Sequence, residues 1–169
     1  MSFIGNRNWD GNGPVLIMSP CAFERRWIAE KELGIVIERT LDFESQPINA
    51  LVSEVGTPSL FGGNGWIAID GAKGKLDPFA SFGNVVILAA SGSGKGFFTI
   101  DYSKEKPWDR KGRLVKWTLD TVSKFGKKIE PQAAAHLVEL TLGEMSLLYQ
   151  EIEKLVTFVG TGDIIDHTA

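Results

Sequence analysis

Short apolar runs alternate with stretches of helical periodicity over the first hundred residues of the chain. Continuous apolar runs begin at Val15 and, after Asn84, at Val85, and shorter ones begin at Ile35, Trp66 and Phe97. Such runs are typical of strands that are buried inside a parallel sheet. The pattern therefore predicts a series of buried strands, and the long, fully apolar run that ends at Ala90 is expected to lie near the centre of the sheet.

Two stretches between these strands have the periodicity of helices. Ser19 and Pro20 are suited to start the first helix, and Gly34 is suited to end it. Ser45 is a plausible cap for the second helix, whose apolar residues follow the spacing of a single helix face: Ile48, Leu51, Val52 and Val55. Strands that alternate with helices predict an α/β domain with a mainly parallel sheet.

Beyond this region the apolar pattern is only helical. It predicts one helix from Arg113 to Phe125, a second that starts at Pro131, and a third whose apolar face begins at Met145 and which Gly160 ends. Three helices joined by tight turns are expected to form a small bundle. The predicted organisation is an α/β domain over residues 1–103, followed by a helical domain over residues 104–169.

The charged residues change character near the same boundary. Residues 104–128 hold nine basic and three acidic residues, whereas residues 129–169 hold one basic and seven acidic residues. The whole chain of 169 residues has a net charge of only -3 and is 43% hydrophobic, which is ordinary for a globular protein. The composition thus excludes a protein that binds polyanions over its whole surface. The basic segment over residues 104–128 is a local feature that needs its own explanation.

Few residues are suited to catalysis or metal binding. Cys21 is the single cysteine, so it cannot form an internal disulfide, and a reducing, cytoplasmic setting fits it. His136 and His167 have no companion nucleophile, and no spacing assembles a metal site. No apolar run is long enough for a membrane span, and the polar start of the chain is unlike a signal peptide. We therefore expect no catalytic residue, no metal and no cofactor.

One stretch looks like a phosphate-binding loop. Gly92, Gly94 and Lys95 follow an apolar run, as in the Gly-x4-Gly-Lys-Ser/Thr motif. Aligned on Gly94-Lys95, however, Ala89 stands at the first glycine of the motif and Gly96 stands where the hydroxyl residue belongs. The next residues read as a strand, although the motif requires a helix whose N-terminus faces the phosphates. We interpret this stretch as a flexible loop at a strand end and keep a nucleotide-binding site as the alternative.

A second unusual stretch lies between the second predicted helix and the strand near Trp66. Thr57, Pro58 and Ser59 precede Leu60 and Phe61, and two glycines, Gly62 and Gly63, follow. Turn residues are normally polar because they face water, so two large apolar residues at a turn need a reason. Either the pair folds onto the core, or it is presented to a binding partner.

With these residues in view, the chain resembles the delta subunit of the bacterial DNA polymerase III clamp loader. The stretch Thr57-Pro58-Ser59-Leu60-Phe61-Gly62 is similar to a "TxSLFG" stretch of that family. The strand at Val85–Leu88 and two helical stretches from Ile129 and Leu148, the latter ending in Glu151-Ile152-Glu153-Lys154-Leu155, also match in order. The resemblance covers roughly residues 14–166.

The resemblance implies an AAA+-like domain without a working phosphate-binding loop, followed by a helical lid domain. It implies a non-hydrolysing subunit of a DNA polymerase holoenzyme that contacts the sliding clamp and helps open the ring. Leu60 and Phe61 match the pair that enters a pocket on the clamp, and Thr57, Pro58, Ser59 and Gly62 would shape the turn. The implied partners are the sliding clamp, the clamp-loader ATPase and delta-prime subunits, and DNA only within the assembly. Members of the family carry a third, oligomerising domain, for which we expect no counterpart among these 169 residues.

Two other functions remain as alternatives. The first is a small nucleotidase that uses Lys95, with Gly92 and Gly94 in its loop. The second is a nucleic-acid-binding module in the basic segment, where Trp108 and Trp117 are interleaved with lysines. We favour instead a solvated helix face there, with both tryptophans in the core.

Overall fold

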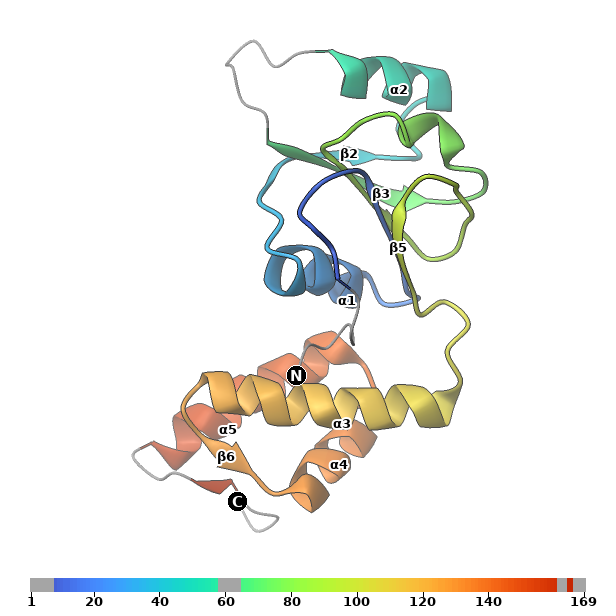
Figure 1. The fold of residues 1–169 in the computed structure, drawn as a ribbon. Coiled ribbons are helices and arrows are strands. Elements are labelled where there is room, and N and C mark those ends of the chain that lie inside the picture. The colour runs from blue at the N-terminus through green and yellow to red at the C-terminus, as the bar shows by residue number, and fades with distance from the viewer. Residues whose placement is uncertain (1–7, 58–64, 161–163, 166–169) are drawn as a thin grey trace. The chain divides into compact units, whose positions relative to one another are not determined.

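The computed structural model describes residues 8–57, 65–160 and 164–165. The chain divides into two compact units, of which one ends at Lys104 and the other begins at Glu105. The first unit contains the larger sheet, and the second is mainly helical (Figure 1). The two units are described separately below.

The first unit is built on a five-stranded parallel sheet with the order β2-β3-β4-β1-β5. Its strands are β1 (Val15–Met18), β2 (Ile37–Asp42), β3 (Trp66–Ala72), β4 (Val85–Ala89) and β5 (Phe98–Asp101). The apolar strand β4 lies between β3 and β1, so its predicted central place is confirmed. Strands β2, β3 and β4 lie on one side of β1, and β5 lies on its other side. The strand order therefore reverses at β1, and open α/β sheets bind ligands at the carboxyl ends of the strands next to such a switch point.

The helices of this unit start later than the sequence suggested. The first is α1 (Ala22–Trp27), which continues as a π-helix over Ile28–Glu32, and Gly34 follows it with a φ of 68°. The second is α2 (Ile48–Gly56), with Pro47 in the N-cap position. The predicted cap at Ser45 is wrong, because its hydroxyl donates to the Asp42 carbonyl at 2.6 Å inside a turn.

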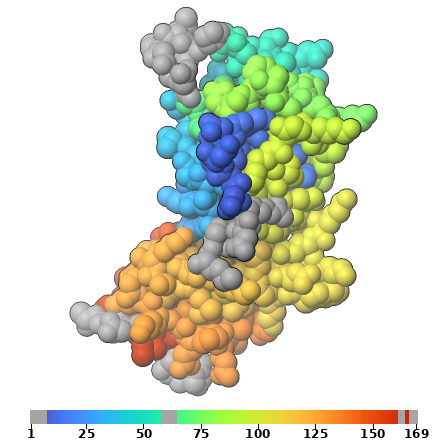
Figure 2. Space-filling view, viewed as in Figure 1, coloured from blue at the N-terminus to red at the C-terminus, as the bar shows by residue number. Residues whose placement is uncertain are grey.

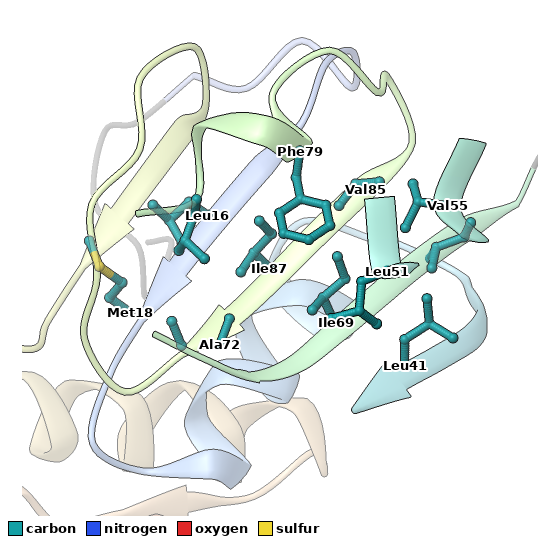
Figure 3. Packing of buried hydrophobic residues seen from close by; sticks show 13 residues of the cluster. Leu16, Met18, Leu41, Leu51, Val55, Ile69, Ala72, Phe79, Val85 and Ile87 are labelled. Atoms are coloured by element: carbon teal, nitrogen blue, oxygen red, sulfur yellow. The ribbon is translucent and has the colours of Figure 1, made fainter. Parts of the chain in front are cut away.

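The core of this unit lies between one face of the sheet and two covering segments. Leu51 and Val55 of α2 pack on it, as does Phe79 of a short 3-10 helix, η2 (Asp77–Phe79) (Figure 3). Leu16 and Ile87 are among the sheet residues that meet them. The predicted apolar face of α2 is confirmed, and burial of each large side chain contributes about 1.5–3 kcal/mol.

The second unit contains three helices and a short pair of parallel strands. The helices are α3 (Pro107–Lys124), α4 (Pro131–Leu140) and α5 (Met145–Val159), and the strands are β6 (Lys128–Ile129) and β7 (Ile164–Ile165). Helix α3 starts six residues before the predicted Arg113, because Pro107 opens a first turn that has no apolar periodicity. The strand pair was not predicted, since two residues are too few to form a pattern.

The two tryptophans of helix α3 have opposite surroundings. Trp117 is buried and its ring lies 6.3 Å from that of Tyr149, measured between centroids. Trp108, in the first turn, is 66% exposed. The expectation that both tryptophans lie in the core is therefore wrong for Trp108.

Candidate functional site

The stretch that holds the predicted binding pair is only partly within the described residues. Leu60 and Phe61, together with Pro58, Ser59 and Gly62, lie outside them. Thr57 is described and is the C-cap of α2, where its extended backbone leaves the helix. Its hydroxyl donates to the Ser53 carbonyl at 2.8 Å, and its backbone N–H donates to the Glu54 carbonyl at 3.2 Å. The first residue of the predicted binding stretch is therefore held to the end of α2 by two hydrogen bonds.

The last turns of α2 are fixed to the sheet. Leu51 is fully buried and Val55 nearly so, which holds one helix face against the core. On the outer side, the Arg39 guanidinium of β2 donates to both the carboxylate and the backbone carbonyl of Glu54, at 3.4 and 3.2 Å. Gln46 donates to the same carboxylate at 2.5 Å. These contacts tie the helix end to strand β2.

The chain re-enters the described residues at Gly65, directly before β3. The Asn84 side chain donates to the Gly65 carbonyl at 2.8 Å, and the Ile67 backbone N–H donates to the Asn84 carbonyl at 2.9 Å. Trp66 pairs with Ile37 in the sheet, and its ring meets Trp9 edge-on at 5.4 Å. Residues 58–64 therefore connect two elements that belong to one core.

The loop that resembles a phosphate-binding loop is fixed to a neighbouring segment. The Ser93 backbone N–H donates to the Gly74 carbonyl at 2.9 Å, and the Ser93 carbonyl accepts from the Leu76 N–H at 2.9 Å. The Lys95 backbone N–H donates to the Asp77 carboxylate at 3.1 Å. These backbone donors would have to face a phosphate in a nucleotide site. The middle of the loop is therefore hydrogen-bonded to the segment that holds Gly74, Leu76 and Asp77.

The glycines of this loop have a packing role. A Cβ on Gly94 would lie 2.7 Å from a ring carbon of Phe97, and a Cβ on Gly92 would lie 3.0 Å from a methyl carbon of Leu76. Leu76 is fully buried and Phe97 packs on the core. After the loop the chain enters strand β5 rather than a helix, as predicted. Close packing therefore explains the glycines without a ligand.

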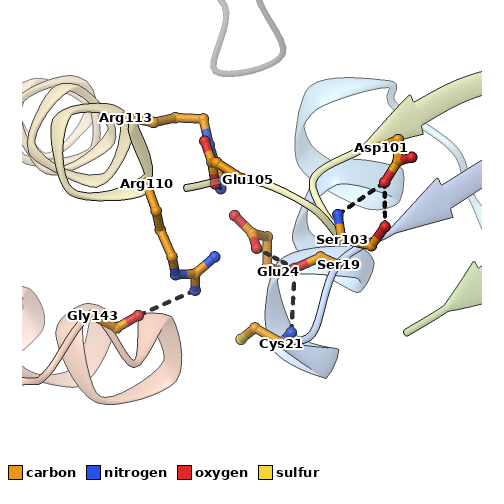
Figure 4. A network of polar contacts seen from close by, with 9 residues as sticks. All are labelled: Ser19, Cys21, Glu24, Asp101, Ser103, Glu105, Arg110, Arg113 and Gly143. Carbon is orange, nitrogen blue, oxygen red and sulfur yellow. Dashed lines mark hydrogen bonds and ion pairs between the residues drawn. The ribbon is translucent and has the colours of Figure 1, made fainter. Parts of the chain in front are cut away.

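A buried polar cluster lies at the carboxyl end of β1, the switch point of the sheet. The Ser19 hydroxyl donates to the Glu24 carboxylate and accepts from the Cys21 N–H at 3.2 Å (Figure 4). Neither Ser19 nor Glu24 has exposed surface. Arg25 donates to the Ser19 carbonyl at 2.7 Å and lies 3.7 Å from the Asp70 carboxylate. Ser19 therefore helps to start α1, but it does so through this cluster.

This cluster is unsuited to a phosphate group. A phosphate needs several converging N–H donors, and Pro20 contributes none. Glu24 instead places acceptor oxygens there, and the Ser19 hydroxyl is already engaged. Sequence reasoning missed the cluster because it examined the loop at Lys95 rather than the end of β1. The available signal was a Ser-Pro pair after a buried strand, followed by an acidic and a basic residue, Glu24 and Arg25, in the first helix.

Among the described residues, no group of three or more His, Cys, Asp or Glu side chains could hold a metal ion. His136 is exposed on α4, and Cys21 is buried at the start of α1. Within the same part of the chain, no helix combines the length and the apolar character that crossing a bilayer requires.

Comparison with solved structures identifies a similar fold. The Bacillus subtilis DNA clamp loader delta protein (YqeN) matches with a TM-score of 0.60 and 17% sequence identity. The match covers 91% of this chain and 56% of the B. subtilis chain, so this chain spans little more than half of that protein's length. At this level of identity the match describes the fold.

A Thermotoga maritima RuvB structure, "RUVB R170A", also matches, with a TM-score of 0.46 and 12% identity over 92% of this chain and 59% of that chain. No protein-family model matches this sequence, and no curated protein does. The five-stranded parallel sheet agrees with the predicted AAA+-like α/β class. The chain is thus similar in fold to the matched part of the B. subtilis clamp loader delta protein.

Proposed function

We propose that this chain is a clamp-loader subunit that binds a DNA sliding clamp through Leu60 and Phe61 and helps open the ring during replication. The observation that carries the proposal is the likeness in fold to the B. subtilis delta protein over 91% of this chain. The motif Thr57-Pro58-Ser59-Leu60-Phe61-Gly62 supports it independently, because it resembles the family's contact stretch.

The surroundings of the motif suit an anchor of this kind. Hot-spot residues are most effective when a rigid framework presents them, because less conformational entropy is then lost on binding. Here the preceding helix is fixed by Leu51 and Arg39, and the following strand by Asn84. An apolar pair that fills a pocket buries a few hundred Å² at about 25 cal/mol per Å², before the costs of association.

The subunit would act without hydrolysing nucleotide. The carboxyl end of β1 holds the Ser19–Glu24 hydrogen bond, and the backbone donors at Ser93 and Lys95 bond within the protein. Its action on the ring would instead rest on differential affinity. If Leu60 and Phe61 bind the clamp more tightly when its ring is open than when it is closed, binding shifts the ring's equilibrium toward the open form.

The other partners follow from the same proposal. ATPase and delta-prime subunits would supply nucleotide-driven changes, and DNA would meet this chain within the assembly. This chain spans 56% of the matched B. subtilis structure, so these contacts belong to the proposal rather than to the fold comparison.

The test is gel filtration of the chain with a bacterial sliding clamp. The wild-type chain is expected to co-elute with the clamp, and the variant L60A/F61A is expected to elute separately. A matched control, L140A/F158A, removes one leucine and one phenylalanine that are 68% and 80% exposed on other helices. The control is expected to bind like the wild type.

Circular dichroism of all variants completes the test. The proposal requires L60A/F61A to keep the wild-type spectrum and melting temperature, because a presented pair contributes little to the core. Normal clamp binding by this variant, or its unfolding, would overturn the assignment of the pair. A wild-type chain that never binds a clamp would overturn the proposed function itself.

A further inference from the structure

Helix α3 carries an exposed aromatic ring at its N-terminal end. Trp108 is 66% exposed in the first turn, just after Pro107. This end of the helix, yellow in Figure 2, lies on the surface that the view shows. A large aromatic ring in water is unfavourable, and exposed tryptophan is concentrated at binding sites. The exposed face of the ring therefore favours a partner that can stack on it with a flat, apolar face.

One basic side chain lies over this ring, and others follow along the same helix. The Lys106 ammonium lies 5.2 Å from the ring centroid, a cation–π distance. Lys111 and Lys116 follow on the same helix and are exposed, with Lys111 also bonded to Glu139 at 2.5 Å. Over residues 104–128 basic residues outnumber acidic ones by nine to three. The charge around the ring therefore favours an anionic partner.

Gly112 leaves a position on the same face of helix α3 without a side chain. It lies one helical turn after Trp108 and one turn before Lys116, so the three residues share a face. A Cβ on Gly112 would meet nothing within 4 Å, and its φ is not in the left-handed region. Glycine is poor in a helix interior, and packing does not require it here. A bare backbone is useful where a ligand must approach closely.

We propose that Trp108, Gly112 and the lysines Lys106 and Lys116 form a binding site for single-stranded nucleic acid. A base stacks on the Trp108 ring, its sugar and backbone pass over Gly112, and the lysines neutralise the flanking phosphates. Duplex DNA fits less well, because its bases are already stacked on one another. An acidic protein surface would match the charge, but it has no bases to stack on the Trp108 ring and does not need the close backbone approach that Gly112 permits.

This site does not depend on clamp binding, since it lies in the helical unit and uses none of residues 57–63. The test is fluorescence anisotropy of a labelled oligothymidylate titrated with the full chain at low salt. W108A is expected to weaken binding about tenfold, as loss of one stacked base does, and W108F is expected to restore most of the affinity. K116A should weaken binding and lower the slope of log K against log salt by about 0.7.

Gly112→Ala separates binding from stability. Alanine is the better helix former, so G112A should raise the melting temperature by about 2–4 °C while it weakens oligonucleotide binding. The control variants F158A and K154A change an exposed ring and an exposed lysine on helix α5 and should bind normally.

Three results would overturn the proposal. The first is no binding of oligothymidylate by the wild-type chain at low salt. The second is equal affinity of W108A and the wild type. The third is binding of duplex DNA or heparin as tight as that of the oligonucleotide, which would indicate charge attraction without stacking.

Discussion

The Ser19 hydroxyl donates a hydrogen bond to the Glu24 carboxylate, and neither residue has exposed surface. The bond lies at the carboxyl end of β1, where an open parallel sheet of this order would bind a ligand. The chain thus fills with its own polar groups the place where a related fold could hold a phosphate.

Ser19→Ala is expected to destabilise the first unit. The Glu24 carboxylate would keep its buried position and lose a hydrogen-bond donor, which costs about 1–3 kcal/mol. The measurement is urea unfolding followed by circular dichroism. Arg26→Ala is the control, because its pair with Glu30 is exposed and contributes at most about 1 kcal/mol. Equal stability of the two variants would mean that the buried hydrogen bond is unimportant.

Gly94→Ala is also expected to destabilise the protein. The new Cβ would lie 2.7 and 2.9 Å from two ring carbons of Phe97, and moving that ring costs about 1–3 kcal/mol. Gly83→Ala is the matched control, since a Cβ there would meet nothing within 4 Å. Thermal unfolding compares the two variants. If Gly94→Ala melts like the control, the packing explanation for this glycine is wrong.

Nucleotide is expected to leave the melting temperature unchanged. A nucleotide at a hundred times its Kd would add about 2.7 kcal/mol of stability, a shift of several degrees. The backbone N–H of Lys95 bonds to Asp77 instead, and its side chain is exposed. Differential scanning fluorimetry with magnesium and ATP checks this expectation. A rise in melting temperature that Lys95→Ala abolishes would establish the alternative nucleotidase.

Two ion pairs of the helical unit should differ in strength. Arg113 donates to Glu105 through two nitrogens, at 2.7 and 2.5 Å, and both side chains are 12% exposed (Figure 4). Glu105→Ala leaves a poorly hydrated guanidinium and should cost about 3 kcal/mol. Glu139→Ala breaks an exposed pair with Lys111 and should cost much less than Glu105→Ala, because solvent screens the pair. Urea unfolding that ranks the two variants in the opposite order would contradict this comparison.

The same exposed pair sets the direction of a pH effect. The hydrogen bond from Lys111, and then its charge, lower the pKa of Glu139. A carboxylate with a lowered pKa in the folded state contributes stability above its unfolded pKa and loses it as the pH falls through the folded value. The stability difference between the wild type and Glu139→Ala should therefore be small at neutral pH and vanish in acid. A difference that grows in acid would contradict this sign.

The fold could be predicted largely because burial leaves a pattern in the sequence. The apolar run of β4 and the helical stripe of α2 correspond to residues that are buried on both faces or on one face. Helix starts left no such pattern. Ser45 bonds within a turn instead of capping, and Pro107 starts α3 in a stretch without apolar periodicity.

The candidate sites were harder to predict, because they depend on which side chains meet in space. The Ser19–Glu24 cluster joins a residue that the sequence presents as a helix start with an acidic residue five positions later, which periodicity alone does not mark as buried. Trp108 and Trp117 are nine positions apart on one helix, which is about two and a half turns and places them on opposite faces. Only one of them can therefore face the core, and it is Trp117. The glycines near Lys95 looked like a ligand loop until Phe97 and Leu76 accounted for them.

The most direct test of the central claim is the dissociation constant of the chain for a sliding clamp, measured by surface plasmon resonance. The account predicts saturable binding by the wild-type chain and a loss of at least about thirtyfold for L60A/F61A, as expected for the removal of a hot spot. L140A/F158A should bind within about twofold of the wild type, since surface substitutions outside an interface change little. A folded L60A/F61A variant that binds the clamp as tightly as the wild type would contradict the account.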